Sequence, residues 1–167
     1  MLEEAEVLYV DQVRSYRRGQ AGSEENLHAG SRLPVYCTAM GKLLLAYLPE
    51  DEQRAVITRM KLTKRAPNTI TSKGVLREEL AEIKEAGFAV SDRELAPGRY
   101  AVAVPVRNDA RDVVAAVSLA ADSSVISLEE LVDALGPHLL AAAERISARL
   151  GYRRATRLSD ERRRKAV

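Results

Sequence analysis

The main-chain amides of residues 39–41 could bind an anion, because they follow the point at which a helix is expected to begin. Pro34 prevents a helix from running back through the preceding residue, whereas the residues from Gly41 to position 48 are apolar apart from Lys42, so a buried helix should start near Thr38. The first amides of a helix have no intrahelical acceptor, and the helix dipole favours a negative charge there. Gly41 would also let another group approach the backbone closely. The alternative interpretation is a loop that simply enters a core helix.

Cys37 lies at the same helix start and is a second candidate for chemistry, since a helix N-terminus lowers the pKa of a thiol and makes it nucleophilic. A catalytic thiol needs a base, and the sequence places neither His28 nor His138 to serve it. A buried structural cysteine is the commoner case, so we expect no enzyme activity. A single cysteine also excludes an internal disulfide and a multi-cysteine metal site. We expect neither a metal nor a cofactor.

Composition predicts one soluble domain with an aliphatic core. The 167 residues are 46% hydrophobic and 30% charged, with one Phe and no Trp, and a chain of this length can bury a sizeable core. The net charge of +2 is uneven, because residues 153–167 carry seven Lys or Arg against two acids, which leaves −3 for residues 1–152. A domain that grips DNA by itself shows a basic face, and this body does not. We expect a ligand-binding domain over residues 1–152 and a basic, disordered tail over residues 153–167.

We expect neither a membrane-spanning segment nor a signal peptide in this sequence. No apolar run reaches the roughly 20 residues that cross a bilayer, and the acidic start of the chain lacks the charge pattern of a signal peptide. We expect a cytoplasmic protein without a membrane partner.

The residue pattern predicts an α+β fold, in which helices pack on an antiparallel sheet and a long helix closes the chain. A short loop at residues 108–110 joins the last two strands, which must therefore be antiparallel. Ser127 and Glu130 form a capping box at the start of the last helix, and Pro137 should kink it. We expect strands at residues 6–13, near 26–29, at 88–94, 99–106 and 112–121, and helices at 38–48, 50–60, 73–86 and 128–150. The last helix should bury Leu128, Leu131, Leu135, Leu139, Ala142, Ile146 and Leu150.

Small residues occupy one face of each of the last two strands. In the strand at 99–106, alternation puts Ala101 and Ala103 on the same face. The strand at 112–121 is apolar enough to be buried on both faces, and its smaller face carries Val114, Ala116, Ser118 and Ala120. Such a surface either leaves a hollow that a ligand could fill or packs tightly against a helix; the sequence favours neither.

Three charged residues follow one another at the end of the strand predicted at 88–94. Alternation places Arg93 on the face opposite Asp92 and Glu94. One of these faces could meet a ligand, and solvated charges at a sheet edge are an equal alternative.

Several motifs, in order, resemble the effector-binding domain of IclR-type bacterial transcriptional regulators. The resemblance covers residues 6–152 and rests on GSRLPVYCTAMGKLLLAYLP, SKGVLREELAEIKEAGFAVSDRELAPG, AVAVPVRND, DVVAAVSLAAD and AAAERISARLGY. The forms YCTAMGK and DRELAPG are most similar to the branch that regulates aromatic-acid (β-ketoadipate) catabolism.

This resemblance implies a GAF-like antiparallel sheet that binds a small carboxylic-acid effector and takes part in homodimer or homotetramer contacts. Operator DNA would be bound only by an N-terminal winged helix-turn-helix domain, which we expect to be absent from this chain. The alternative is a free-standing GAF-like binding module or enzyme without a DNA partner.

Carried over by position, the family's ligand-binding residues fall on Leu33, Ala39, Met40, Gly41, Asp92 (or its neighbour Ser91), Ala101, Ser118 and Ala120. Alanine at 101 and 120, where some members have polar side chains, predicts a roomy and less polar pocket. We therefore expect an aromatic or dicarboxylic acid. Its carboxylate would lie on the amides of residues 39–41, Ser118 would donate a hydrogen bond, and Leu33, Met40 and Ala101 would pack on its apolar body.

Overall fold

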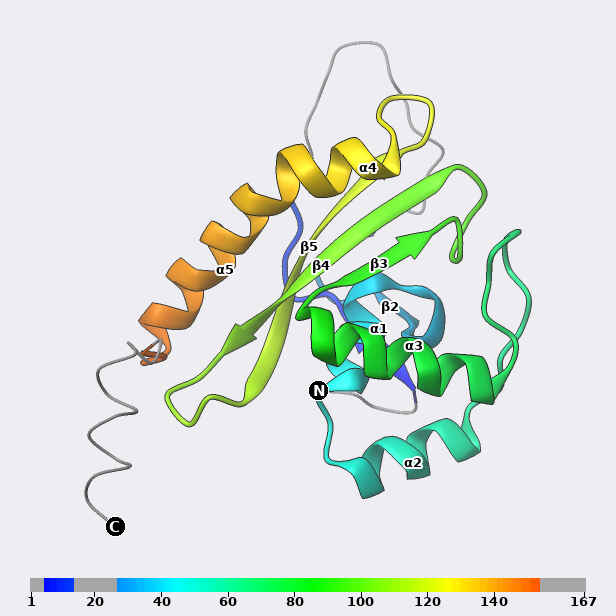
Figure 1. The fold of residues 1–167 in the computed structure, drawn as a ribbon, viewed down its shortest axis with the longest axis horizontal. Helices are drawn as coiled ribbons and strands as arrows, with labels where there is room; N and C mark the ends of the chain where they lie inside the picture. Colours follow the sequence, from blue (N-terminus) through cyan, green and yellow to red (C-terminus); the bar gives the residue numbers. More distant parts are fainter. Residues whose placement is uncertain (1–4, 14–26, 154–167) are drawn as a thin grey trace.

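The computed structural model describes residues 5–13 and 27–153. Its architecture confirms the predicted α+β fold, with antiparallel sheets, helices packed on them and a long helical C-terminal segment (Figure 1). The predicted tail, from residue 154 onwards, and most of the loop expected before residue 27 lie outside the described residues. The elements are β1 (Glu6–Leu8), β2 (Arg32–Pro34), a 3-10 turn (Val35–Cys37), α1 (Ala39–Ala46), α2 (Glu50–Arg59), α3 (Lys73–Ala86), β3 (Ala89–Asp92), β4 (Arg99–Arg107), β5 (Val113–Asp122), α4 (Leu128–Glu130), a π-helical segment (Leu131–Leu135) and α5 (Gly136–Arg149).

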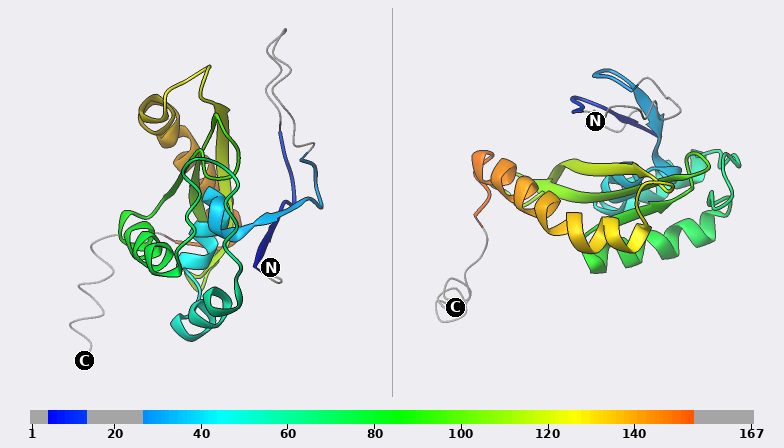
Figure 2. Two further views of the ribbon diagram at one scale, coloured as in Figure 1. Left: turned by 90° about the vertical axis from the view of Figure 1, so that its right-hand side faces the viewer. Right: turned by 90° about the horizontal axis from the view of Figure 1, so that it is seen from above.

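The described strands form two antiparallel sheets, β1–β2 and β3–β4–β5. Helix α1 packs on one face of the three-stranded sheet and against α3, and α5 packs on the opposite face. Two views agree that α5 and the β1–β2 pair lie on opposite sides of this sheet (Figure 2). Helix α1 therefore contacts the sheet, α3 and the 3-10 turn that precedes it.

The first strand is shorter than predicted. It ends at Leu8 and pairs with β2, so that Val7 lies opposite Leu33. The short strand expected near residues 26–29 is wrong within the described residues, since the chain forms a turn at Ala29 and Gly30 instead. Pro34, which we expected only to prevent a helix, ends β2.

The C-terminal helix buries a different stripe from the one predicted. Leu135, Ile146 and Leu150 are at least one-third exposed, whereas Ala143 and Ser147 are buried. The cause is the π-helical segment directly before Gly136 and Pro137, because a π turn contains an extra residue and rotates everything after it around the axis. The stripe from residue 139 onwards consequently recurs at Leu139, Ala143 and Ser147.

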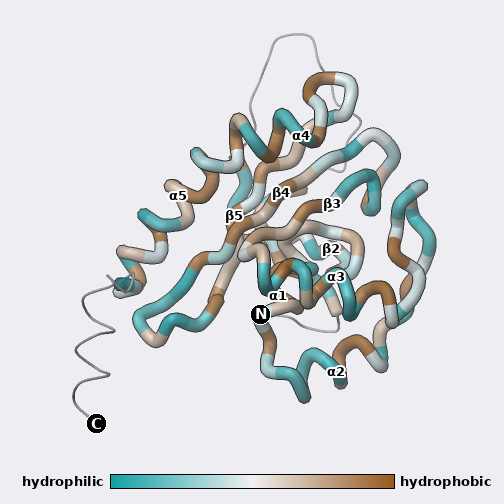
Figure 3. The backbone as a smooth tube through the Cα atoms, in the orientation of Figure 1, coloured by the Kyte–Doolittle hydropathy of each residue, from teal (hydrophilic) through white to brown (hydrophobic). Residues whose placement is uncertain are grey.

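Strand β5 is an edge of the described sheet, and the prediction that both its faces are buried is wrong. All its residues are at least partly exposed, and Val114 is 48% exposed. Hydrophobic segments follow the strands of this sheet, while the β4–β5 turn and much of α2 are hydrophilic (Figure 3). Within the described parts of the chain, none of the helices has the length and apolar character needed to span a membrane.

Candidate functional site

The first turn of α1 offers two unpaired amides rather than the three expected. Thr38 caps the helix: its hydroxyl oxygen accepts from the Gly41 amide at 3.2 Å, and the same hydroxyl donates to the Pro34 carbonyl at 2.9 Å. Among the described residues, the amides of Ala39 and Met40 have no acceptor. This end of the helix can therefore donate two main-chain hydrogen bonds to an anion.

Gly41 is required for a reason other than access by a ligand. A Cβ atom at this position would lie 2.5 Å from the Val35 Cα, 2.5 Å from the Val35 carbonyl oxygen and 2.5 Å from the Thr38 Oγ1. The group that approaches the backbone of Gly41 is thus the chain's own 3-10 turn. The expectations of a free Gly41 amide and of an open backbone there are both wrong.

The small residues do share one face of the β3–β4–β5 sheet, as predicted. In register across the strands, Ala103 lies between Ala89 and Ser118, and Ala101 lies between Ser91 and Ala120. Ala89 and Ala103 are buried in the core beneath α1, which is the tight helix packing considered as an alternative. The other half of the face is more open, since Ala101 and Ser118 are half-buried and Ala120 is exposed.

Leu33 lies in β2 and Met40 lies in the first turn of α1. Leu33 is buried in β2, opposite Val7. Met40 is half-buried and packs on the core that contains α1 and the small-residue face. Ala39 is also buried. The structure thus brings the predicted residues of α1, β4 and β5 into one region of the domain, whereas Leu33 packs in the β1–β2 pair.

Asp92 is the predicted site residue that the structure does not bring to this face. It pairs with Tyr100, whose side chain packs with the α5 core, and its carboxylate accepts from Arg93 at 2.7 Å and from Asn68 at 3.0 Å. The hydrogen bond from Arg93 is the main cause that lowers the pKa of Asp92. The residue of this strand on the small-residue face is Ser91, whose hydroxyl donates to the Cys37 carbonyl at 3.2 Å.

Arg93 also departs from the predicted alternation. The strand ends at Asp92, and Arg93 has a left-handed backbone with φ of 50°. Its guanidinium therefore turns back onto Asp92 and lies 5.8 Å from the centre of the Tyr100 ring. Glu94 is thereby directed into the domain.

A buried ionic cluster that we did not predict lies beneath α1. Lys42 is fully buried, and its Nζ lies 2.6 Å from Glu94 Oε1 and 2.7 Å from Glu79 Oε1 of α3. Burial is the largest influence on Glu94 and raises its pKa; Lys42 opposes this. The available signal was Lys42 itself, a single charged residue in an apolar helix, which needs a buried partner.

Cys37 is part of the core beneath α1 and not a nucleophile. It is fully buried, and its Sγ lies 4.0 Å from the Pro34 carbonyl oxygen. Both His28 and His138 are exposed. The structural interpretation of this cysteine is the correct one.

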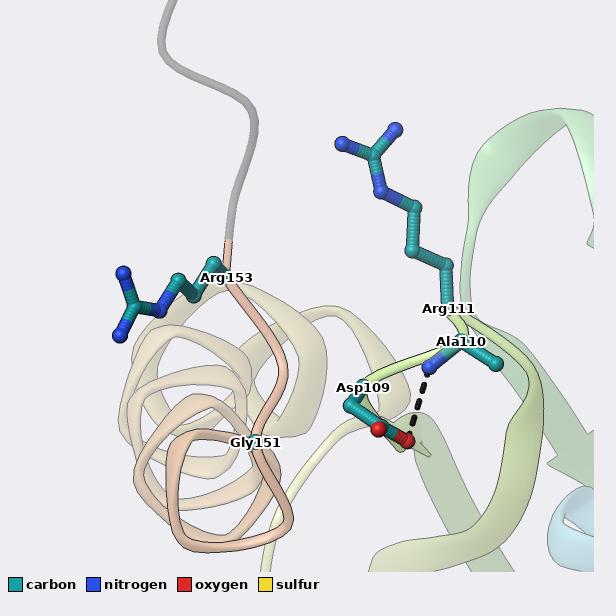
Figure 4. Close-up of a pocket in the computed structure, with 5 residues that line it drawn as sticks. All are labelled: Asp109, Ala110, Arg111, Gly151 and Arg153. Carbon is teal, nitrogen blue, oxygen red and sulfur yellow. Dashed lines mark hydrogen bonds between the residues drawn. The ribbon is translucent and has the colours of Figure 1, made fainter.

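A separate surface pocket lies where the β4–β5 turn meets the end of α5. It is lined by Asp109, Ala110, Arg111, Gly151 and Arg153. The two arginine side chains extend outwards, and the Asp109 carboxylate accepts from the Ala110 amide at 3.0 Å (Figure 4). None of the predicted site residues lines this pocket.

Comparison with known proteins gives a consistent result. The family model for the C-terminal part of the bacterial transcriptional regulator IclR matches residues 1–148. The chain is 33% identical over 146 residues to the probable transcriptional regulator SauR of Cupriavidus necator, covering 87% of this chain and 56% of SauR. It is 32% identical over 118 residues to the Pca regulon regulatory protein of Pseudomonas putida, covering 71% and 40% respectively. The chain thus spans about half the length of these relatives.

One solved structure of similar fold is a complex with a small organic acid. It is a double mutant of the inducer-binding domain of the transcription factor PobR from Acinetobacter, in complex with 3-hydroxybenzoic acid. The TM-score is 0.79 at 29% identity, covering 87% of this chain and 83% of that one.

Proposed function

Because this chain belongs to the IclR family of bacterial transcriptional regulators and corresponds to its C-terminal domain, we propose that it binds a small organic acid and thereby controls a regulator's attachment to operator DNA. The relatives are transcriptional regulators and not enzymes. DNA contacts would be made by an N-terminal helix-turn-helix domain of the whole protein, which would act in the cytoplasm.

The effector lies between the first turn of α1 and the open half of the small-residue face. The observation that carries this proposal is the pair of unpaired amides of Ala39 and Met40 beside a sheet face lined with small residues. A carboxylate has two oxygens, which match two convergent main-chain donors at a helix N-terminus. Support comes from the similar PobR domain, whose structure is a complex with an aromatic hydroxy acid.

The residues of the face favour an effector with an apolar body. Ala101 and Ala120 leave room where longer side chains would fill space, and Leu33 and Met40 supply apolar contacts. The Ser118 hydroxyl has no hydrogen-bond partner among the described residues and could donate to the ligand. Asp92 has no part in this proposal, because it lies on the other face.

Thermal unfolding with a panel of acids tests the proposal. The panel contains 3-hydroxybenzoate, 4-hydroxybenzoate, protocatechuate, succinate, glyoxylate and pyruvate. A ligand at about 100 times its Kd stabilises the folded state by about 2.7 kcal/mol, which raises Tm by roughly 5–11 °C in a chain of this size. We expect such a shift with at least one aromatic or dicarboxylic acid.

Two substitutions in β5 locate the site. Ser118→Leu fills the open half of the face and should abolish the shift, whereas Val114→Leu, on the same strand and largely exposed, should retain it. A panel without any shift would overturn the proposal. Calorimetry that shows glyoxylate or pyruvate binding far tighter than every aromatic acid would overturn the preference for a larger effector.

We also propose that the domain forms homodimers or homotetramers. The observation behind this is the set of large apolar side chains that α5 and the preceding segment leave exposed: Leu135, Leu140, Ile146 and Leu150. Sedimentation of the purified chain tests it, and a monomer at micromolar concentration would contradict it.

A further inference from the structure

The Lys42 cluster contains one cation and two carboxylates, and one carboxylate oxygen has no partner. The side chain of Glu94 is 8% exposed, and its Oε1 is bonded to Lys42. Its Oε2 is buried and, among the described residues, has no hydrogen-bond partner. An orphaned carboxylate oxygen in the interior is costly unless a proton or a donor reaches it.

Glu94 is the member of the cluster at which a proton relieves this cost. The Glu79 side chain is 32% exposed, so water can stabilise its negative charge. Lys42 is fully buried, and its ammonium forms ion pairs with both carboxylates. With Glu94 ionised the cluster has a net charge of −1 in the interior, and with Glu94 protonated it is neutral.

The groups that face Glu94 come from each element packed around it. Burial and the Glu79 charge from α3 raise the pKa of Glu94, and Lys42 from α1 and the Asp92 amide of β3 lower it, with burial the largest influence. The hydroxyl of Thr69, in the loop before α3, donates to the Glu94 carbonyl at 2.6 Å and holds the backbone in place.

The Lys42 cluster and the proposed effector site share helix α1. Lys42 lies in the first turns of α1. Its main-chain amide donates to the carbonyl of Thr38, the residue that caps the helix. The unpaired amides of Ala39 and Met40 are three and two residues before Lys42. A carboxylate placed on these amides would add a negative charge near Glu94 and favour its protonated form.

We propose that Lys42, Glu79 and Glu94 form an internal proton-binding site, and that a proton at Glu94 and a carboxylate at the start of α1 bind cooperatively. The second half of this proposal rests on the proposed function, and the first half does not. Lys42 and Glu94 act as positioning residues, since they hold the first turn of α1 without touching the ligand.

Nuclear magnetic resonance of the unliganded chain tests the proton site. The side-chain carboxyl carbon of Glu94 should titrate at a higher pH than those of Glu78 and Glu82, which are exposed on α3 and serve as internal references. Glu79→Gln removes a neighbouring negative charge and should lower the Glu94 midpoint. A Glu94 midpoint equal to or below those of the references would overturn the proton site.

Calorimetry with 3-hydroxybenzoate tests the coupling. Titrations at the same pH in buffers of different ionisation enthalpy measure the protons taken up on binding. We expect uptake of a fraction of one proton by the unmodified chain, with affinity that rises by up to about tenfold for each unit of pH decrease. Uptake should vanish in Glu94→Gln and shift to lower pH in Glu79→Gln. Zero uptake by the unmodified chain at every pH above the ordinary 4.5 of a glutamate, or unchanged uptake in Glu94→Gln, would overturn the coupling.

Two further results distinguish failure of the coupling from failure of the proton site or of the proposed function. If Glu94→Gln does not fold, Glu79→Gln, which alters the more exposed partner, decides the coupling by itself. If no acid of the panel binds, the proposed function and the coupling both fail, whereas the resonance titration of the unliganded chain still decides the proton site.

Discussion

Replacing Gly41 by alanine should destabilise the domain, against the usual effect of this substitution in a helix. Alanine normally stabilises a helix interior by about 1 kcal/mol relative to glycine. Here the new Cβ would lie 2.5 Å from two backbone atoms of Val35 and from Thr38 Oγ1. Backbone atoms cannot rotate away, so the 3-10 turn must move or α1 must shift from the sheet.

The expected size follows from overpacking. Forcing a methyl group into a packed site costs about 1–3 kcal/mol, occasionally more, and two of the three close contacts are with backbone. We expect a net loss of about 2 kcal/mol, because these contacts exceed the gain in helix propensity. In a chain of this length that corresponds to a fall in Tm of roughly 4–8 °C.

Gly74→Ala is the matched control. Gly74 is an exposed position of α3, and a Cβ there would meet only the Ser72 hydroxyl oxygen at 3.6 Å, an ordinary contact. This variant should gain about 0.5–1 kcal/mol, which raises Tm by roughly 1–4 °C. The pair compares the same chemical change in two helices of one protein.

Thermal unfolding followed by circular dichroism measures both variants, and urea unfolding gives the free energies. If Gly41→Ala unfolds at or above the Tm of the unmodified chain, the close approach of Val35 does not explain this glycine. If its Tm is unchanged while carboxylate binding is lost, Gly41 serves the ligand, as its position in the sequence first indicated.

Five other substitutions test the charged groups and the small-residue face. Lys42→Met leaves Glu94 buried without its cation and should lower the free energy of unfolding in urea by about 3–5 kcal/mol. Glu79→Gln alters the more exposed partner and should lower it by under about 1 kcal/mol. Equal losses in the two variants would contradict the burial argument. Because the pKa of Glu94 is raised above its ordinary 4.5, its proton stabilises the fold fully below that pH and the contribution is lost as pH rises through the raised value. Stability between about pH 4 and 8 should show this decline in the unmodified chain and not in Glu94→Gln. Asp92→Asn should lower the free energy of unfolding by under about 1 kcal/mol. Because the pKa of Asp92 is lowered from 3.8, this loss should be seen mainly above pH 3.8. A changed effector Kd in this variant would contradict the position of Asp92 on the other face of the sheet. Ser118→Ala should weaken effector binding about fivefold, or about 1 kcal/mol, with no change in the Tm of the unliganded chain; unaltered calorimetric affinity would remove the hydroxyl from the site.

The sequence predicted best the elements whose ends are decided locally. Helix α3 has the predicted bounds, and Gly87 ends it with a φ of 81°, the left-handed cap that glycine favours. The faces of β4 and β5 also followed from alternation, because both strands are regular over the residues concerned. Local propensity and strand periodicity were sufficient for these parts.

Predictions failed where one residue changed the backbone geometry. A left-handed conformation at Arg93 ended the alternation and separated the roles of Asp92 and Glu94. A π-helical segment before Gly136 moved the buried stripe of α5. Arg93 gives no local signal of the kind that glycine provides. Pro137 indicated a kink in the last helix, but not the extra residue that a π-helical turn inserts before it.

The buried cluster was missed because its members are far apart in the chain. Lys42 and Glu94 are separated by 52 residues, and only the packing of α1 between the sheet and α3 brings them together. The sequence showed one lysine in an apolar helix but not which carboxylate it would meet. Burial of a charge identifies the need for a partner, while the fold alone identifies the partner.

The cluster also constrains what the effector site can do. The ammonium of Lys42 is already bonded to two carboxylates, so it is not available to neutralise an effector. The anion at the start of α1 would then depend on the amides of Ala39 and Met40, whose contribution is that of main-chain hydrogen bonds and a helix dipole, each of order 1 kcal/mol. Such a site cannot bind a two-carbon acid tightly by charge alone. Affinity must come from apolar contact with the sheet face, and for this reason we expect it to rise with the size of the effector's body.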